Sequence, residues 1–71
     1  MEQKHPNDDL VRDGLDRVRD ACTFLGLSQA MVYKLMDSGM LPFVKLGRSR
    51  RIPHKALIEL AARNLVGGSV K

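Results

Sequence analysis

Residues 28–53 read SQAMVYKLMDSGMLPFVKLGRSRRIP, and this stretch decides the fold. Ser28 is a favoured helix N-cap, because its hydroxyl can accept a hydrogen bond from backbone N–H groups that no helical carbonyl reaches. Val32, Leu35 and Met36 then recur at helical spacing as one apolar stripe, and a glycine follows where the helix should stop. The stretch therefore begins with a predicted capped helix that has one buried side and one free side.

A short β-hairpin is predicted after this helix. The segments 43–46 and 50–52 alternate apolar and polar residues, and they flank Gly47-Arg48-Ser49, a turn sequence. Pro42 separates the hairpin from the helix, since the residue before a proline disfavours helical geometry. Pro53 suits the first turn of a further helix, because the N–H that it lacks would be unpaired there.

Apolar spacing predicts a helix on each side of this stretch. The earlier helix should run from about Arg17 to Leu25, with Asp16 as its N-cap and Gly26 as a left-handed C-cap. The later helix should run over residues 54–65. Two helices joined by a tight turn are the arrangement of a helix-turn-helix, whose second helix enters the DNA major groove.

The predicted fold class is mainly α with a small β-hairpin, a winged helix-turn-helix. Seventy-one residues suffice for one small domain. We assign residues 15–65 to that domain, residues 1–14 to a flexible N-terminal tail and residues 66–71 to a flexible C-terminal tail.

Positive charge is concentrated from the hairpin onward. Residues 43–71 hold seven Lys and Arg against Glu59 alone, a net charge of +6, whereas residues 1–14 carry −2 and residues 15–42 are neutral. Such a distribution favours a polyanionic partner. A solvated, charged hairpin edge is the alternative interpretation of the arginines.

Other classes of function are not indicated. Cys22 has no second cysteine with which to form a disulfide, and the two histidines do not complete a metal site. No catalytic constellation is present, so an enzyme is not expected, nor is a cofactor. The chain has no apolar run long enough to cross a membrane, and we expect a cytoplasmic protein.

The free side of the 28–39 helix and the hairpin supply the candidate DNA contacts. Gln29 can bond an adenine edge, and Ala30 or Met31 can contact a thymine methyl group. Tyr33 and Lys34 are better placed for phosphate contacts, which carry no sequence information. The full candidate set is Ser28, Gln29, Ala30, Met31, Tyr33, Lys34, Lys45, Arg48, Ser49, Arg50 and Arg51.

Several motifs together resemble one known family. They are Leu25-Gly26-Leu27-Ser28, Val32-Tyr33-Lys34-Leu35, Gly39-Met40-Leu41-Pro42, Val44-Lys45-Leu46-Gly47-Arg48 and Arg51-Ile52-Pro53. Residues 18–60 thus resemble the excisionase-type helix-turn-helix family, which is related to the DNA-binding domains of MerR-like regulators. The resemblance implies that the 28–39 helix occupies the major groove, that Arg48, Ser49 and Arg50 reach the adjacent minor groove or its phosphates, and that Arg51 supports the wing.

Members of that family, encoded by phages and integrative elements, often act as recombination directionality factors. The resemblance therefore implies a protein that binds adjacent sites as several copies, bends attachment-site DNA and biases an integrase toward excision. The chain lacks the C-terminal coiled coil or effector domain of MerR-like regulators, so no small-molecule effector is expected. A small transcriptional regulator with the same fold is one alternative, and a protein-interaction module without affinity for DNA is another.

Overall fold

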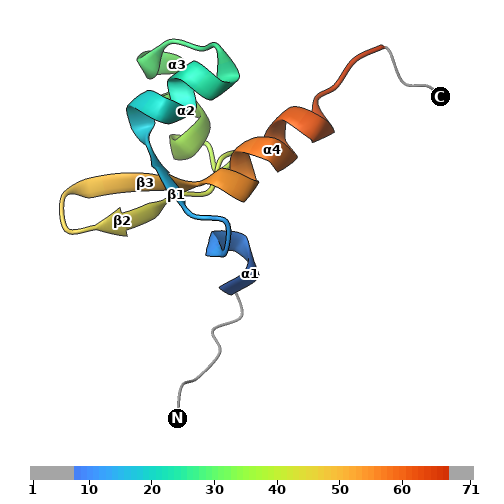
Figure 1. Ribbon diagram of the computed structural model, residues 1–71. Coiled ribbons are helices and arrows are strands. Elements are labelled where there is room, and N and C mark those ends of the chain that lie inside the picture. Colours follow the sequence, from blue (N-terminus) through green and yellow to red (C-terminus); the bar gives the residue numbers. More distant parts are fainter. Residues whose placement is uncertain (1–7, 68–71) are drawn as a thin grey trace.

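The computed structural model describes residues 8–67, which form four helices and three strands (Figure 1). In chain order these are α1 (Asp8–Val11), β1 (Leu15–Arg17), α2 (Val18–Leu25), α3 (Gln29–Asp37), β2 (Val44–Leu46), β3 (Ser49–Pro53) and α4 (His54–Arg63). The β2–β3 hairpin extends from one side of the body, α4 extends from the other, and α2 and α3 lie together above the sheet. This arrangement confirms the winged helix-turn-helix prediction.

Helix α3 begins and ends where the sequence predicts. The Ser28 hydroxyl oxygen accepts a hydrogen bond from the backbone N–H of Met31 at 3.2 Å. The helix closes at Asp37, and Gly39 then takes a φ of +86°, which only glycine adopts readily. Gly26 likewise ends α2 in the left-handed conformation, so a short turn joins the two helices.

The wing is the hairpin of β2 and β3, joined by a two-residue turn at Gly47 and Arg48. Gly47 has a φ of +64°, and no described non-glycine residue has a positive φ. A single positive φ at the first turn position is the pattern of a type II′ turn, which requires glycine there. Ser49, predicted as part of the turn, instead pairs with Leu46 as the first residue of β3.

Strand β1 is an element that the sequence did not predict. It pairs antiparallel with β3, which is therefore the central strand of a three-stranded sheet in the order β1-β3-β2. The prediction that Asp16 caps α2 is wrong, because the helix starts one residue later, after an extended Arg17 with no side-chain cap. Asp16 Oδ2 instead lies 2.7 Å from His54 Nδ1, and the backbone N–H of His54 donates to Gly14 O at 2.9 Å. These contacts fix β1 to the start of α4.

Residues 8–14, which the sequence analysis placed in the N-terminal tail, contain α1, and Leu10 packs against the core. Residues 1–7 and 68–71 lie outside the described part of the chain. None of the helices between residues 8 and 67 has the length and apolar character needed to cross a bilayer.

One core joins the three longer helices to the sheet. Its buried members are Val18, Ala21, Val32, Met36, Leu41, Ile52, Ala56, Leu57 and Leu60. The stripe predicted for α3 lies in this core, with Val32 fully buried and Leu35 partly buried against it. Packing of this stripe fixes which side of α3 remains exposed, and so positions the candidate interface.

Candidate nucleic-acid interface

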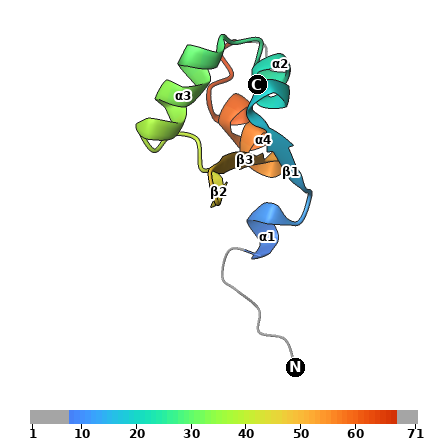
Figure 2. The ribbon, with the colours of Figure 1, turned by 90° about the vertical axis from the view of Figure 1, so that its left-hand side faces the viewer.

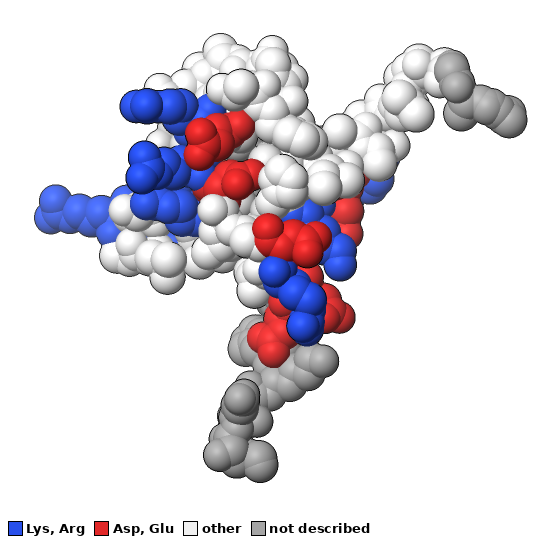
Figure 3. All heavy atoms as spheres, viewed as in Figure 1, with Lys and Arg blue, Asp and Glu red and all other residues white. Residues whose placement is uncertain are grey.

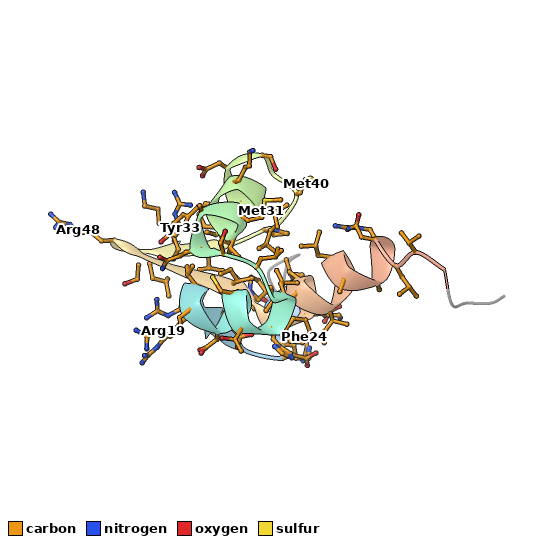
Figure 4. The ribbon with its side chains drawn as sticks, turned by 90° about the horizontal axis from the view of Figure 1, so that it is seen from above. Arg19, Phe24, Met31, Tyr33, Met40 and Arg48 are labelled. Carbon is orange, nitrogen blue, oxygen red and sulfur yellow. The ribbon has the colours of Figure 1, made fainter. Side chains whose placement is uncertain are left out.

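Helix α3 and the wing are presented on the same side of the molecule. When the wing points toward the viewer, α3 lies on one side of it and α2 with β1 on the other (Figure 2). Seen from above, Arg48 marks the far end of the wing, and Tyr33 lies on the flank of α3 that is nearer to it (Figure 4). A winged helix-turn-helix needs this arrangement if both elements are to touch one duplex.

The exposed face of α3 follows from its helical periodicity. Ala30, Lys34 and Asp37 recur at positions i, i+4 and i+7, opposite the buried stripe, and all three are exposed. Gln29 and Tyr33, also exposed, occupy the flank beside them. Four of the candidate DNA-contacting residues therefore share one continuous exposed surface with Asp37, which is not a member of the candidate set.

Met31 lies on the opposite flank of α3. It lines an apolar pocket of about 310 Å³ whose wall is formed by Leu25, Leu27, Met31, Leu35, Met40, Leu60, Ala61 and Asn64. In Figure 4, Met31 and Met40 lie toward α4, away from Arg48. The structure thus separates Met31 from the other candidates on α3.

The candidates on the wing divide between its two faces and its tip. Arg48 and Ser49 are exposed at the tip. Lys45 is the cross-strand partner of Arg50, so both side chains project from the same face of the hairpin. Arg51 projects from the other face, is partly buried, and donates through Nη1 to the carbonyl of Arg50 at 3.0 Å.

Arg50 faces α3 rather than solvent. Its guanidinium carbon lies 4.6 Å from the centre of the Phe43 ring and 5.1 Å from the centre of the Tyr33 ring. One of its nitrogens, Nη1, lies 3.4 Å from Asp37 Oδ1. Arg50 therefore contacts α3 at two residues and joins it to the wing.

Lys and Arg side chains gather on the edge of the molecule from which the wing projects (Figure 3). Two of the exposed cations near it are absent from the candidate set predicted from the sequence. Arg17 is the cross-strand partner of Arg51, and Arg19 lies in the first turn of α2, on the side of the wing in Figure 4. The neutral charge of residues 15–42 concealed them, and only strand β1 brings Arg17 beside the wing.

Within the described residues, no group of three or more His, Cys, Asp and Glu side chains could hold a metal ion. Cys22 is a free, partly buried thiol. The Lys and Arg side chains on α3 and the wing are hydrogen-bond donors only, and the Ser, Tyr and Gln side chains there can donate as well as accept. Asp37 is the acidic side chain on this surface. The surface is therefore suited to contacts with an anion.

Comparison with known proteins defines the class. The family model described as "Helix-turn-helix domain" matches residues 17–65, and the chain belongs to this family. This match and the similarity to a probable excisionase together support the excisionase type of helix-turn-helix.

A probable excisionase of Saccharopolyspora erythraea is 44% identical to this chain over 46 residues. The matched segment covers 65% of this chain and 47% of the relative, so the chain matches about half of the relative's length. No solved structure gives a significant match.

Proposed function

We propose that this chain is a DNA-binding architectural protein of the excisionase type, which bends attachment-site DNA and biases an integrase toward excision. The observation that carries the proposal is that α3 and the wing lie on the same side of the molecule, where one duplex can contact both. The similarity to a probable excisionase favours this role over that of a transcriptional regulator, the alternative use of the same fold. A protein with this role acts in the cytoplasm, on the bacterial nucleoid.

In the proposed complex, the exposed face of α3 enters the major groove. Gln29 reads a base edge and Ala30 meets a thymine methyl group, while Ser28, Tyr33 and Lys34 hold the position of the helix through the sugar-phosphate backbone. This division predicts that Gln29→Ala relaxes the preference at one base pair without weakening binding to all sequences.

The wing tip reaches the adjacent minor groove or its phosphates. Arg48 and Ser49 lie at the tip, and Lys45 lies on the hairpin face that is directed toward α3. If Lys34, Lys45 and Arg48 each neutralise one phosphate, log K should fall with log salt at a slope of about −2.7. The affinity should then decrease roughly 40-fold between 50 and 200 mM salt.

Several copies should bind side by side. One α3 helix reads few base pairs, so useful specificity requires adjacent sites. Bending 20–30 base pairs costs on the order of 1–6 kcal/mol, and contacts from several copies would offset that cost. We therefore expect cooperative occupation of repeated sites, with a bend that increases as they fill.

A footprint over the DNA that flanks the gene tests the proposal, combined with gel mobility of circularly permuted fragments to measure the bend. Repeated protected sites and a bent complex are expected, and both should weaken in Arg48→Ala. Arg63→Ala is the matched control, because it removes one exposed cation from the end of α4 that points away from the wing (Figure 1). One isolated site bound tightly without a bend would contradict the architectural role. Protection of a promoter with no effect on integrase-driven excision would favour the regulator.

A further inference from the structure

We propose that Arg50 is a positioning residue that sets the spacing between the wing and α3, and that it does not contact DNA phosphate. The inference rests on the proposed function, because the spacing matters only if both elements grip one duplex. It also changes the assignment expected from the sequence, in which Arg50 belongs to the DNA-contacting set.

The surroundings of Arg50 are those of a packed side chain. Its guanidinium carbon lies 4.6 Å from the centre of the Phe43 ring and 5.1 Å from that of the Tyr33 ring, both within the range of a cation–π contact. The Arg50 side chain is 28% exposed, whereas that of its ion-pair partner Asp37 is 68% exposed. Two of the three contacts are with α3 and the third is with the loop that leads into β2. The Arg50 side chain, which belongs to β3, therefore joins the wing to α3.

Charge balance favours the same assignment. Lys45 is the direct cross-strand neighbour of Arg50, and like charges in that position repel. Asp37 lies 3.4 Å from the guanidinium and offsets this repulsion. Asp37 is otherwise an unfavourable residue on a face that meets DNA, because its carboxylate would be repelled by phosphate. As a pair, Asp37 and Arg50 present no net charge to the duplex.

A phosphate contact through Nη1 of Arg50 would compete with Asp37 for that nitrogen, and the two ring contacts hold the guanidinium beside α3 and Phe43. Arg48 has no such constraint, since it is exposed at the wing tip. The two arginines are thus two residues apart in sequence but have different tasks: Arg48 supplies charge to the DNA, and Arg50 determines where the wing, and so Arg48, is held.

The salt dependence of binding separates these tasks. Fluorescence anisotropy with a labelled 20-base-pair duplex would give log K against log salt for the wild type, for Arg48→Ala, Arg50→Lys and Asp37→Asn, and for Asp37→Asn combined with Arg50→Ala. Arg48→Ala should reduce the slope by about 0.9, because one fewer counterion is released. Arg50→Ala, introduced beside Asp37→Asn so that no unpaired carboxylate is left next to the DNA, should weaken binding roughly 5- to 30-fold with the slope of Asp37→Asn unchanged. Arg50→Lys should not restore affinity, since an ammonium group lacks the planar surface with which a guanidinium stacks on aromatic rings. A slope reduced by about 0.9 when Arg50→Ala is added to Asp37→Asn, with the affinity restored by lysine at position 50, would overturn the proposal.

A second variant, Phe43→Leu, and hydrogen exchange in the free protein test the positioning role of Arg50 without relying on one substitution. Phe43→Leu removes one ring beside Arg50 and keeps an apolar side chain against the core. It should weaken binding at constant slope, as Arg50→Ala does beside Asp37→Asn, whereas a phosphate contact by Arg50 predicts no effect. In the free protein, both variants should speed amide hydrogen exchange in β2 and β3 but not in α4.

The two possible failures can be distinguished. If the wild type does not bind the duplex at low salt, the proposed function is wrong, and hydrogen exchange alone decides whether Arg50 fixes the wing. Unchanged exchange in the hairpin of both variants would refute the positioning role whether or not DNA binds.

Discussion

Replacing Ser28 tests whether the N-cap of α3 supports both the fold and the proposed interface. The Ser28 hydroxyl accepts from the Met31 N–H at 3.2 Å, and the residue is exposed, so Ser28→Ala removes the cap without leaving a buried cavity. The backbone hydrogen bond from Val32 N to Ser28 O, at 3.1 Å, is kept. Loss of such a cap costs about 1 kcal/mol, which corresponds to a fall in Tm of about 4–8 °C for a domain of this size.

The assay is thermal unfolding followed by circular dichroism, with two further variants. Ser28→Asp should restore the Tm, because a carboxylate also caps and is favoured by the helix dipole. Its DNA affinity should nevertheless be lower than that of the wild type, since the added charge lies on the proposed phosphate-facing end of α3. Ser49→Ala, an exposed serine on the wing, should leave the Tm unchanged. An unaltered Tm in Ser28→Ala, or no recovery in Ser28→Asp, would refute the capping argument.

Three other substitutions test the fold that carries the interface. Leu57→Ala, at a fully buried core position, should lower the free energy of unfolding by about 2–5 kcal/mol in urea titration, and a smaller change would contradict the described core. Gly47→Ala should lower the free energy of unfolding by about 1–2 kcal/mol, because a residue with a Cβ is strained at a φ of +64° even though nothing lies within 4 Å of the added atom. The DNA affinity of this variant should fall as well. Unchanged stability would exclude the turn described for the wing. Asp16→Ala breaks the contact with His54 and should cost about 1 kcal/mol, whereas the exposed Asp13→Ala should have no effect on the urea midpoint.

Local sequence signals sufficed for the helices and the hairpin. A serine cap, an apolar stripe at helical spacing and a glycine stop define α3 without reference to the rest of the chain. Gly47 and the flanking alternation define the wing in the same way, although its turn is one residue shorter than predicted. Each of these signals acts within a few residues of the element that it specifies.

Strand β1 and the pairing of its residues depend on contacts that are distant in sequence. Three residues are too few to show an alternating pattern, and β1 forms because β3 offers it a free edge. Without β1, the sequence predicts Asp16 as a helix cap, whereas its carboxylate contacts His54, 38 residues away.

The grouping of the candidate residues also required the structure. The sequence identifies a cluster of arginines but not which face each one occupies, so Arg48 and Arg50 could not be told apart. Met31 lies at the border between the polar and apolar sides of α3, and only the structure shows that it lines a pocket together with residues of α4. That α3 and the wing lie on the same side of the molecule depends on the core, which holds α3, and on the sheet, which holds the wing.

The most direct measurement for the whole account is an NMR titration of the ¹⁵N-labelled protein with a 20-base-pair duplex at low salt. If α3 and the wing grip one duplex, amide signals from residues 28–34 and 47–49 should shift together and saturate at the same DNA concentration. The signals from the last turn of α4 should remain in place. Shifts confined to α4, or saturation of α3 while the wing is unaffected, would contradict the proposal that α3 and the wing bind the same duplex.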